Sequence, residues 1–214
     1  MNRLDAALDY AQRGLRVFPL HTLAASGTCS CGDGHCRSVA KHPRTTDGFL
    51  SATTDANQIR RWWKKWPDAN IGIATGSGLG VLDVDPRHGG DETIEQIERE
   101  HDCLPNGYEV ATGGGGRHLY FRVPDGTPSR KLGTGVDFKA EGGYVVAPPS
   151  MHASGSEYSL LRSDAIEPAP PWLLSVAPGR RNGGAPVPSE LKEGERNSTP
   201  VSYTHLTLPT ICSV

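Results

Sequence analysis

Long apolar runs are missing from this chain. No stretch of its 214 residues approaches the 18 or more consecutive apolar residues of a membrane-spanning helix. The first twenty residues carry charges throughout and contain no continuous apolar segment, which argues against a secretory signal. We therefore expect a cytoplasmic protein with no membrane partner.

Apolar and aromatic residues are also scarce, at 36% and 7% of the chain. Globular domains contain about 45–50% apolar residues by a count that includes glycine. Here 26 glycines and 17 prolines make up a fifth of the sequence, and they separate apolar segments instead of forming a low-complexity tract. The composition therefore indicates a domain rich in turns. A chain of this length buries about 70% of its surface on folding, so it can fold without disulfide bonds.

A large net charge is absent too. The formal charge is −2, which argues against a protein that binds polyanions through its overall charge. The charges are nevertheless unevenly placed: residues 37–65 carry seven Lys/Arg against two Asp, and residues 83–109 carry nine Asp/Glu against two Arg. Two solvated faces would explain this split. It also suits a protein that holds a polyanion on one side and metal ions on another.

Apolar periodicity predicts an α+β fold, in which a mixed sheet packs on helices. Asp55 and Gln58 have the spacing of a capping box at the start of the second helix. Residues 1–178 are expected to form the domain, and residues 179–214 a polar linker with a truncated or foreign tail. We expect helices over residues 3–13, 55–66 and 91–102, and strands over residues 16–20, 70–76, 79–85, 108–112, 118–123, 135–140, 144–149 and 157–161.

The segment Val81-Leu82-Asp83-Val84-Asp85 carries two carboxylates on a predicted strand. Residues i and i+2 of a strand point to the same face, about 6.6 Å apart along the backbone. Mg²⁺ binds through one or two such carboxylates together with substrate phosphates. The alternative is a pair of acids at a strand end that faces water.

Two further segments carry polar groups at strand positions. Four glycines at 113–116 precede Arg117 and His118, and they form either a cradle for an anion or a flexible hairpin. Asp137 lies within an apolar strand, where a carboxylate needs a metal ion or a partner such as Lys139. Taken together, the motifs supply three carboxylates for two metal ions and basic groups for a triphosphate. This combination suits nucleotidyl transfer.

A cysteine cluster lies in the aperiodic loop at about residues 28–43. Three thiols within eight residues and a nearby histidine suit tetrahedral Zn²⁺ in a reducing compartment. We expect this zinc to be structural and remote from the chemistry, and the alternative is a loop with reduced, unliganded thiols. The predicted ligands are Cys29, Cys31, Cys36 and His42, with His35 as the other candidate for the fourth position.

The predicted second helix mixes cations with three tryptophans. Aromatic rings and cations together can stack bases and bind phosphates, although tryptophans on such a helix also serve as core residues. Lys41 and Arg44 are placed to reach template or nucleotide phosphates. The expected DNA-binding residues on the helix are Arg60, Arg61 and Lys64.

The order of these motifs resembles the bifunctional DNA primase/polymerase (prim-pol) domain of the archaeo-eukaryotic primase superfamily. The family pattern of hydrophobic-Asp-x-Asp, small-x-His and hydrophobic-hydrophobic-Asp maps onto residues 82–85, 116–118 and 135–137. Gly135 replaces a hydrophobic residue of the pattern. The resemblance covers about residues 5–178, and it also takes in residues 14–20, 41–44, 70–76 and 142–150.

This resemblance implies a template-directed primase and polymerase in phage, plasmid or chromosomal-element replication, with an RNA-recognition-motif-like core and a flanking α/β unit. Asp83, Asp85 and Asp137 would bind two Mg²⁺ or Mn²⁺ ions, and His118 would contact the incoming nucleotide. The implied partners are single-stranded DNA template, NTPs or dNTPs, and a helicase module in the intact protein. The other nucleotide-binding candidates are Arg117, Lys139, Ser150 and His152.

Two other functions fit parts of the sequence. A phosphatase of the haloacid-dehalogenase type also begins with an Asp-x-Asp motif on a strand. Such a phosphatase would have Thr or Val two residues after the second Asp, where this chain has Arg87. A non-catalytic zinc-knuckle module that binds single-stranded DNA would use its acidic residues structurally. Incorporation of labelled nucleotides separates a polymerase from both.

Overall fold

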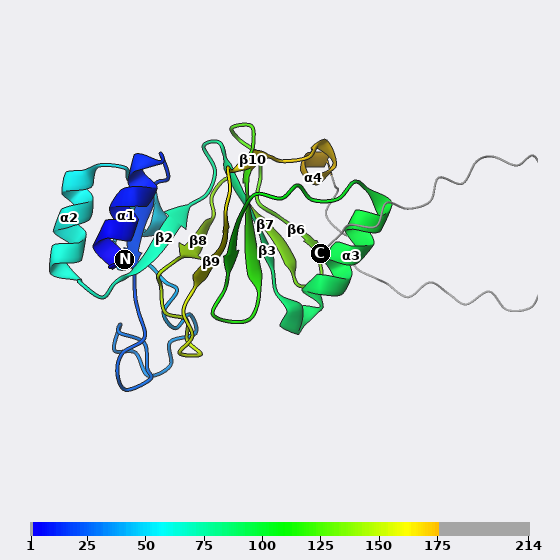
Figure 1. The fold of residues 1–214 in the computed structure, drawn as a ribbon. Coiled ribbons are helices and arrows are strands. Elements are labelled where there is room, and N and C mark those ends of the chain that lie inside the picture. Colours follow the sequence, from blue (N-terminus) through cyan, green and yellow to red (C-terminus); the bar gives the residue numbers. More distant parts are fainter. Residues whose placement is uncertain (1, 176–214) are drawn as a thin grey trace, which may run out of the picture.

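Two β-sheets lie between helices in the computed structural model, which describes residues 2–175 (Figure 1). The smaller sheet has the order β1-β2-β8 and is antiparallel throughout. Its strands are β1 (Val17–Leu20), β2 (Asn70–Ala74) and β8 (Tyr144–Ala147). The helices α1 (Arg3–Gln12) and α2 (Ala56–Lys65) lie beside this sheet at the N-terminal end of the molecule.

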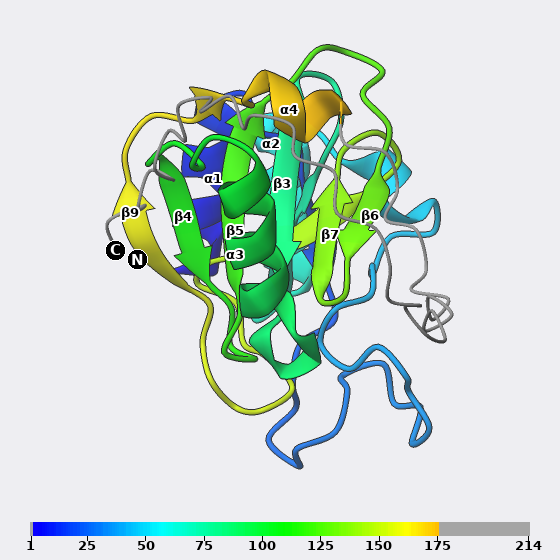
Figure 2. The same cartoon turned by 90° about the vertical axis from the view of Figure 1, so that its right-hand side faces the viewer.

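The larger sheet has seven strands and carries the chemistry-bearing segments. Its strand order is β6-β7-β3-β5-β4-β9, and β10 pairs with β5 in parallel. Helix α3 (Gly90–Glu100) runs along one face of it, and α4 (Pro171–Ser175) lies at one end (Figure 2). The strands are β3 (Leu79–Val84), β4 (Tyr108–Ala111), β5 (Arg117–Arg122), β6 (Arg130–Gly133), β7 (Val136–Lys139), β9 (Ser159–Ser163) and β10 (Glu167–Pro168).

Alternation along the strands of the larger sheet creates two hydrophobic cores. Val81 and Tyr120 point toward the smaller sheet and join the core that also contains the buried residues of α1 and α2. Leu82 and Phe138 point the other way and pack with Ile94 of α3 and other apolar residues. The larger sheet is therefore covered on both faces. A polar residue that points into either core needs a partner, so such residues are candidates for a functional site.

The α+β fold class is confirmed, and each of the expected strands and helices is present with ends shifted by no more than two residues. Strands β6 and β10 and the 3₁₀ turns η1 (Gly48–Ser51) and η2 (Pro86–His88) were not expected. The predicted linker and tail at 179–214 lies outside the described residues. Within residues 2–175, no helix is long and apolar enough to cross a membrane.

The predicted capping box at the start of α2 is wrong in one part. Asp55 is the N-cap residue, and its carboxylate accepts a hydrogen bond from the Asn57 N–H at 2.9 Å. Gln58 does not complete the box, because its side-chain oxygen accepts hydrogen bonds from Arg61. The Thr53 hydroxyl oxygen accepts the hydrogen bond from the Asp55 N–H instead, at 3.0 Å.

Candidate active site and metal cluster

A row of polar side chains crosses the larger sheet near the C-terminal end of β3. The strand register places Asp83 of β3 opposite His118 of β5 on one side and opposite Asp137 of β7 on the other. Directly opposed residues of antiparallel strands share a face, with Cβ atoms about 4.5–5.5 Å apart. The row continues to Lys131 of β6, which is the register partner of Asp137. Pairing therefore assembles four residues that lie far apart in the sequence.

A cavity of about 400 Å³ opens over this row. It is lined by Asp83, Asp85, His118 and Asp137, so the structure brings the predicted catalytic residues to one place. Of the predicted nucleotide and DNA contacts, Lys41 and His152 also line it. Gly114 and Gly116 of the glycine segment line it as well, and so do Arg87, Thr112, Lys131 and Tyr158, which were not predicted as site residues.

His118 forms part of the cavity floor and is only 5% exposed. Its Nε2 lies 3.5 Å from Asp83 Oδ1, and its ring centroid lies 6.0 Å from that of Tyr158. Burial, with the nearby charges of Lys41 and Lys139, lowers the pKa of His118 to about 3. The ring is therefore neutral near pH 7, and its contact with Asp83 is not an ion pair.

Asp83 lies between two other acidic groups and is partly removed from water. Burial raises the pKa of this carboxyl, and the negative charges of Asp137 and Asp85 add to that effect. The positive charge of Lys139 acts in the opposite direction. Neighbouring like charges of this kind are stabilised when a cation binds between them.

Asp137 and Asp85 both have cationic partners from their own chain. Lys139 Nζ donates to Asp137 Oδ2 at 2.9 Å, which is the pairing expected as the alternative to metal binding. Asp85 follows β3 and accepts hydrogen bonds from both Arg87 and His88. These hydrogen bonds hold the pKa of Asp85 well below its usual range, and the hydrogen bond from the Arg87 side chain has the largest effect.

The donor set fits hard divalent ions, which prefer carboxylate oxygens. In the described part of the chain, however, the three carboxylates do not converge within reach of one ion. Asp85 has both oxygens occupied by Arg87 and His88, whereas Lys139 contacts only Oδ2 of Asp137. Metal binding by Asp85 therefore requires its partners to be displaced.

Some predicted site residues lie elsewhere. Arg117 is adjacent to His118 on β5 and so points to the opposite face, where its Nη1 lies 3.5 Å from Glu109. Ser150 is fully buried, and its hydroxyl accepts the Ile71 N–H at 2.9 Å. Arg44 donates to Ser30 and to the Leu20 carbonyl, beside the cysteine loop. The cavity lining includes none of Arg44, Arg117, Lys139 and Ser150, although Lys139 pairs with Asp137, which does line it.

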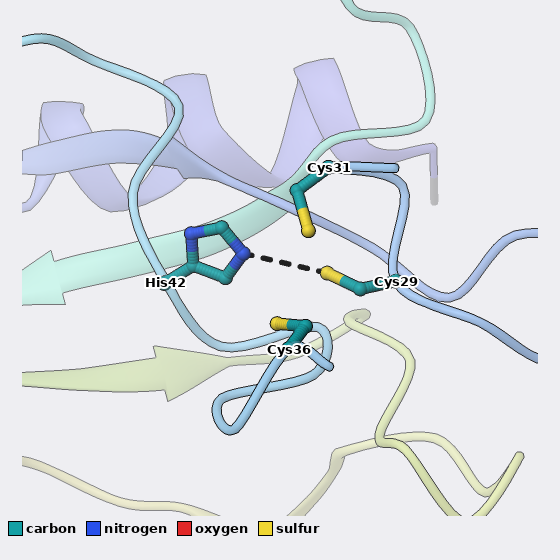
Figure 3. Close-up of side chains that lie close together, drawn as sticks. All are labelled: Cys29, Cys31, Cys36 and His42. Carbon is teal, nitrogen blue, oxygen red and sulfur yellow. Dashed lines mark hydrogen bonds between the residues drawn. The ribbon is translucent and has the colours of Figure 1, made fainter. Parts of the chain in front are cut away.

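The cysteine loop gathers the four residues that were predicted as ligands. The Sγ atoms of Cys29, Cys31 and Cys36 and a ring nitrogen of His42 lie within 4.8 Å of one another, and they point toward a common centre (Figure 3). Bond lengths in a tetrahedral zinc site place its ligand atoms about 3.3–3.8 Å apart, so a small contraction suffices. His35 is not part of this group.

The cluster is linked to the cavity through one residue, although none of its four members lines the cavity. Lys41 directly precedes His42 of the cluster and lines the cavity beside the acidic row. The backbone around it is fixed: Ala40 has φ 61°, its carbonyl accepts from Asn70, and the Lys41 carbonyl accepts from the Tyr144 hydroxyl. A non-glycine residue in the left-handed region needs such support. The loop therefore presents Lys41 to the site.

The residues that sequence reasoning missed carried weak signals. Arg87 follows the Asp-x-Asp segment by two residues, and Tyr158 lies in an expected strand, but neither has a motif of its own. Lys131 lies in a short polar segment that was not expected to form a strand. Register and chain path, which are tertiary properties, bring all three to the cavity.

Comparison with known families gives one match. A family model described as bifunctional DNA primase/polymerase, N-terminal, matches residues 7–172. The matched range includes every residue that lines the cavity and the whole cysteine cluster. No curated protein matches the chain.

Proposed function

Since the chain belongs to the bifunctional DNA primase/polymerase N-terminal family, we propose that it synthesises and extends primers on a single-stranded DNA template. Membership supports a metal-dependent nucleotidyltransferase of the primase/polymerase type that binds nucleic acid and nucleotides. The observation that carries the proposal is the row of His118, Asp83 and Asp137 on the floor of one cavity.

Asp83, Asp85 and Asp137 would hold two Mg²⁺ or Mn²⁺ ions in this proposal. Bound divalent ions stabilise the attacking and leaving oxygens of phosphoryl transfer. Asp83 would be central to this site because it lies between the two other acidic positions. Lys139 neutralises Asp137 until an ion binds, and it then remains beside the cavity as a phosphate contact.

The nucleotide triphosphate would lie over the row, against residues with positive charge or N–H donors. His118 is neutral and offers one N–H from the cavity floor, while Lys41 and Lys131 supply charge from two different elements. His152 lines the same cavity and completes this set. Arg117 and Ser150 are left out because they lie away from the cavity.

We place the DNA template on the basic surface of α2. Arg60, Arg61 and Lys64 are exposed there, whereas Trp63 is buried in the core that α1 and α2 share with the smaller sheet. The buried tryptophan favours phosphate binding by the cations over stacking of bases on that ring. Lys65 lies 4.6 Å from the ring centroid of Trp66 and adds to the same surface.

We propose that the cysteine cluster binds one Zn²⁺, which closes the loop and holds Lys41 at the cavity. Thiolate ligation stabilises the loop because its own apolar contacts are few. Hydrogen bonds from the backbone of Ala40 and Cys31 and from His42 outweigh the effect of burial and lower the pKa of Cys29 to about 6. A thiolate at this position is what zinc binding requires.

The wider setting belongs to the same proposal. Residues 1–178 would form the catalytic domain, whose core would resemble an RNA-recognition motif flanked by the α1–α2 unit. The domain would act in cytoplasmic replication of a phage, plasmid or chromosomal element. A helicase module in the intact protein would supply single-stranded template.

The direct test is incorporation of labelled nucleotides on single-stranded DNA without a primer, with ribonucleotides and deoxynucleotides in separate reactions. Asp85→Ala should abolish primer synthesis and primer extension together, because both need the same metal-binding carboxylates. Binding of single-stranded DNA should persist, since it depends on phosphate contacts by basic residues. Asp9→Asn is the matched control, because Asp9 is an exposed acid that pairs with Arg13 on α1.

Other outcomes identify the alternative functions. Release of phosphate from a small ester, with no nucleotide incorporation, would indicate a phosphatase. Binding of single-stranded DNA with neither reaction would indicate a non-catalytic module. Wild-type rates of extension by a folded Asp85→Ala protein would mean that the carboxylates are structural, and the polymerase assignment would be wrong.

A further inference from the structure

The Asp85 carboxylate has no acceptor position left for a metal ion. Its two oxygens offer about four lone-pair positions. Oδ1 accepts the Arg87 backbone N–H at 3.1 Å and Arg87 Nε at 3.0 Å. Oδ2 lies 3.0 Å from Arg87 Nη2 and 2.9 Å from His88 Nδ1. Three of the four contacts therefore come from Arg87, which binds the carboxylate as a two-pronged fork.

An ion and the Arg87 guanidinium cannot share this carboxylate. Mg²⁺ binds a carboxylate oxygen at about 2.0–2.1 Å, which places it within about 5 Å of a guanidinium nitrogen on the same oxygen. Two positive groups at that distance, one of them divalent, repel each other. When an ion binds Asp85, the guanidinium must therefore move away from it.

In the position in which it binds Asp85, the guanidinium already lies beside the neighbouring loop of the same cavity. A Cβ built on Gly114 would lie 3.1 Å from Arg87 Nη2 and 3.3 Å from His152 Nε2, so the missing side chain lets both groups reach the loop. Arg87, His152 and Gly114 all line the cavity. The Arg87 side chain is 57% exposed, so no packed core restrains it. A planar guanidinium binds phosphate oxygens in pairs, as it binds a carboxylate.

We propose that Arg87 has two successive partners: it occupies Asp85 in the metal-free protein, and it binds the phosphates of the nucleotide beside His152 once a divalent ion has displaced it. The inference rests on the proposed function, because it takes Asp85 as a metal ligand. It adds that ion binding and phosphate binding are coupled through one side chain. The free protein consequently binds ions weakly until Arg87 is released.

The first experiment measures Mn²⁺ binding to the zinc-loaded full chain, without nucleotide, by electron paramagnetic resonance. Arg87→Gln should bind Mn²⁺ at least threefold more tightly than the wild type, because the competing cation is gone. Arg13→Gln is the matched control, since Arg13 forms an exposed 2.7 Å pair with Asp9 on α1, and it should not change the affinity. Equal or weaker Mn²⁺ binding by Arg87→Gln would overturn the proposal.

The second experiment measures binding of inorganic tripolyphosphate at saturating Mn²⁺ by isothermal titration calorimetry. Arg87→Gln should bind the anion at least tenfold more weakly, and Arg87→Lys, which keeps the charge but loses the fork, should lie between. Unchanged affinity in Arg87→Gln would show that the residue is only a partner of Asp85, and the proposal would be wrong. Thermal melting confirms that each variant is folded.

These measurements are independent of catalysis. If the Arg87 variants differ from the wild type in both measurements but the wild type synthesises no DNA, the proposed function is wrong and the coupling still holds. A protein that synthesises DNA but shows neither difference would contradict the coupling alone.

Discussion

The neutral state of His118 makes the stability of this protein sensitive to acid. Burial lowers the pKa of His118 from 6.5 to about 3 in the folded chain, whereas the ring titrates near 6.5 when the chain is unfolded. Between these values the unfolded state binds a proton that the folded state does not. The free energy of unfolding therefore decreases as the pH falls below about 6.5, and this loss is complete near pH 3.

The size of the effect follows from the two pKa values. Each pH unit in that window costs about 1.4 kcal/mol, so lowering the pH from 6.5 to 5 removes about 2 kcal/mol through His118 alone. For a domain of this size, that loss lowers Tm by about 4–8 °C. His21 and His152, whose pKa values burial also lowers, add to the loss, and Asp83, whose pKa is raised by burial, opposes it.

Comparison with His118→Asn isolates the contribution of this ring, because the other titrating groups remain. Melting curves recorded by circular dichroism at pH 7 and pH 5, with zinc-loaded protein and no added Mg²⁺ or Mn²⁺, give the two changes in Tm. The wild type should lose about 4–8 °C more than the variant. His101→Asn, at an exposed position, is the control and should behave as the wild type does. Equal losses in wild type and His118→Asn would refute the assignment of a buried neutral histidine.

Three further predictions concern the structure around the cavity. Cys36→Ser should lower the zinc content from about one ion per chain, measured by metal analysis. It should also weaken tripolyphosphate binding, because zinc holds Lys41 at the cavity in our proposal. Wild-type affinity for tripolyphosphate in zinc-free protein would contradict this link between zinc and Lys41. Asn70→Ala should lower the free energy of unfolding, measured in urea, by about 2–4 kcal/mol. The substitution removes a fully buried amide that is hydrogen-bonded to both Ala40 and Met151. A loss below about 1 kcal/mol would be inconsistent with that role. Arg60→Ala combined with Lys64→Ala should reduce the salt slope of single-stranded DNA binding by about 1.4, since each lost phosphate contact contributes about 0.7; an unchanged slope would place the DNA elsewhere.

Local patterns in the sequence determined the elements of this fold. Short apolar segments bounded by glycines specify strands such as β3 and β5, and the N-cap preference of Asp55 specifies the start of α2, because both depend on neighbours along the chain. The cysteine cluster was predictable for the same reason, since Cys29, Cys31 and Cys36 lie within eight residues. The Asp-x-Asp spacing likewise placed Asp83 on a strand.

The tertiary structure decided which side chains share the cavity and what each one contacts. The pairing register, which no local pattern encodes, placed His118 and Asp137 on either side of Asp83. Arg117, one residue away from His118, faces Glu109 on the opposite side of the sheet. Ser150 was assigned to the nucleotide from its motif, but its hydroxyl satisfies a buried backbone N–H.

Charge compensation was predictable from the sequence only for Asp137, whose partner Lys139 lies two residues away on the same strand. Asp85 and Arg87 stand two residues apart, and only the turn after β3 folds the guanidinium back onto the carboxylate. Lys41 reaches the cavity because the cysteine loop and the supported turn at Ala40 direct it there. The sequence by itself determined which chemical groups are present and which element carries each. Three-dimensional packing determined their partners, because a side chain's electrostatic environment is set by residues that are distant in the chain and close in space.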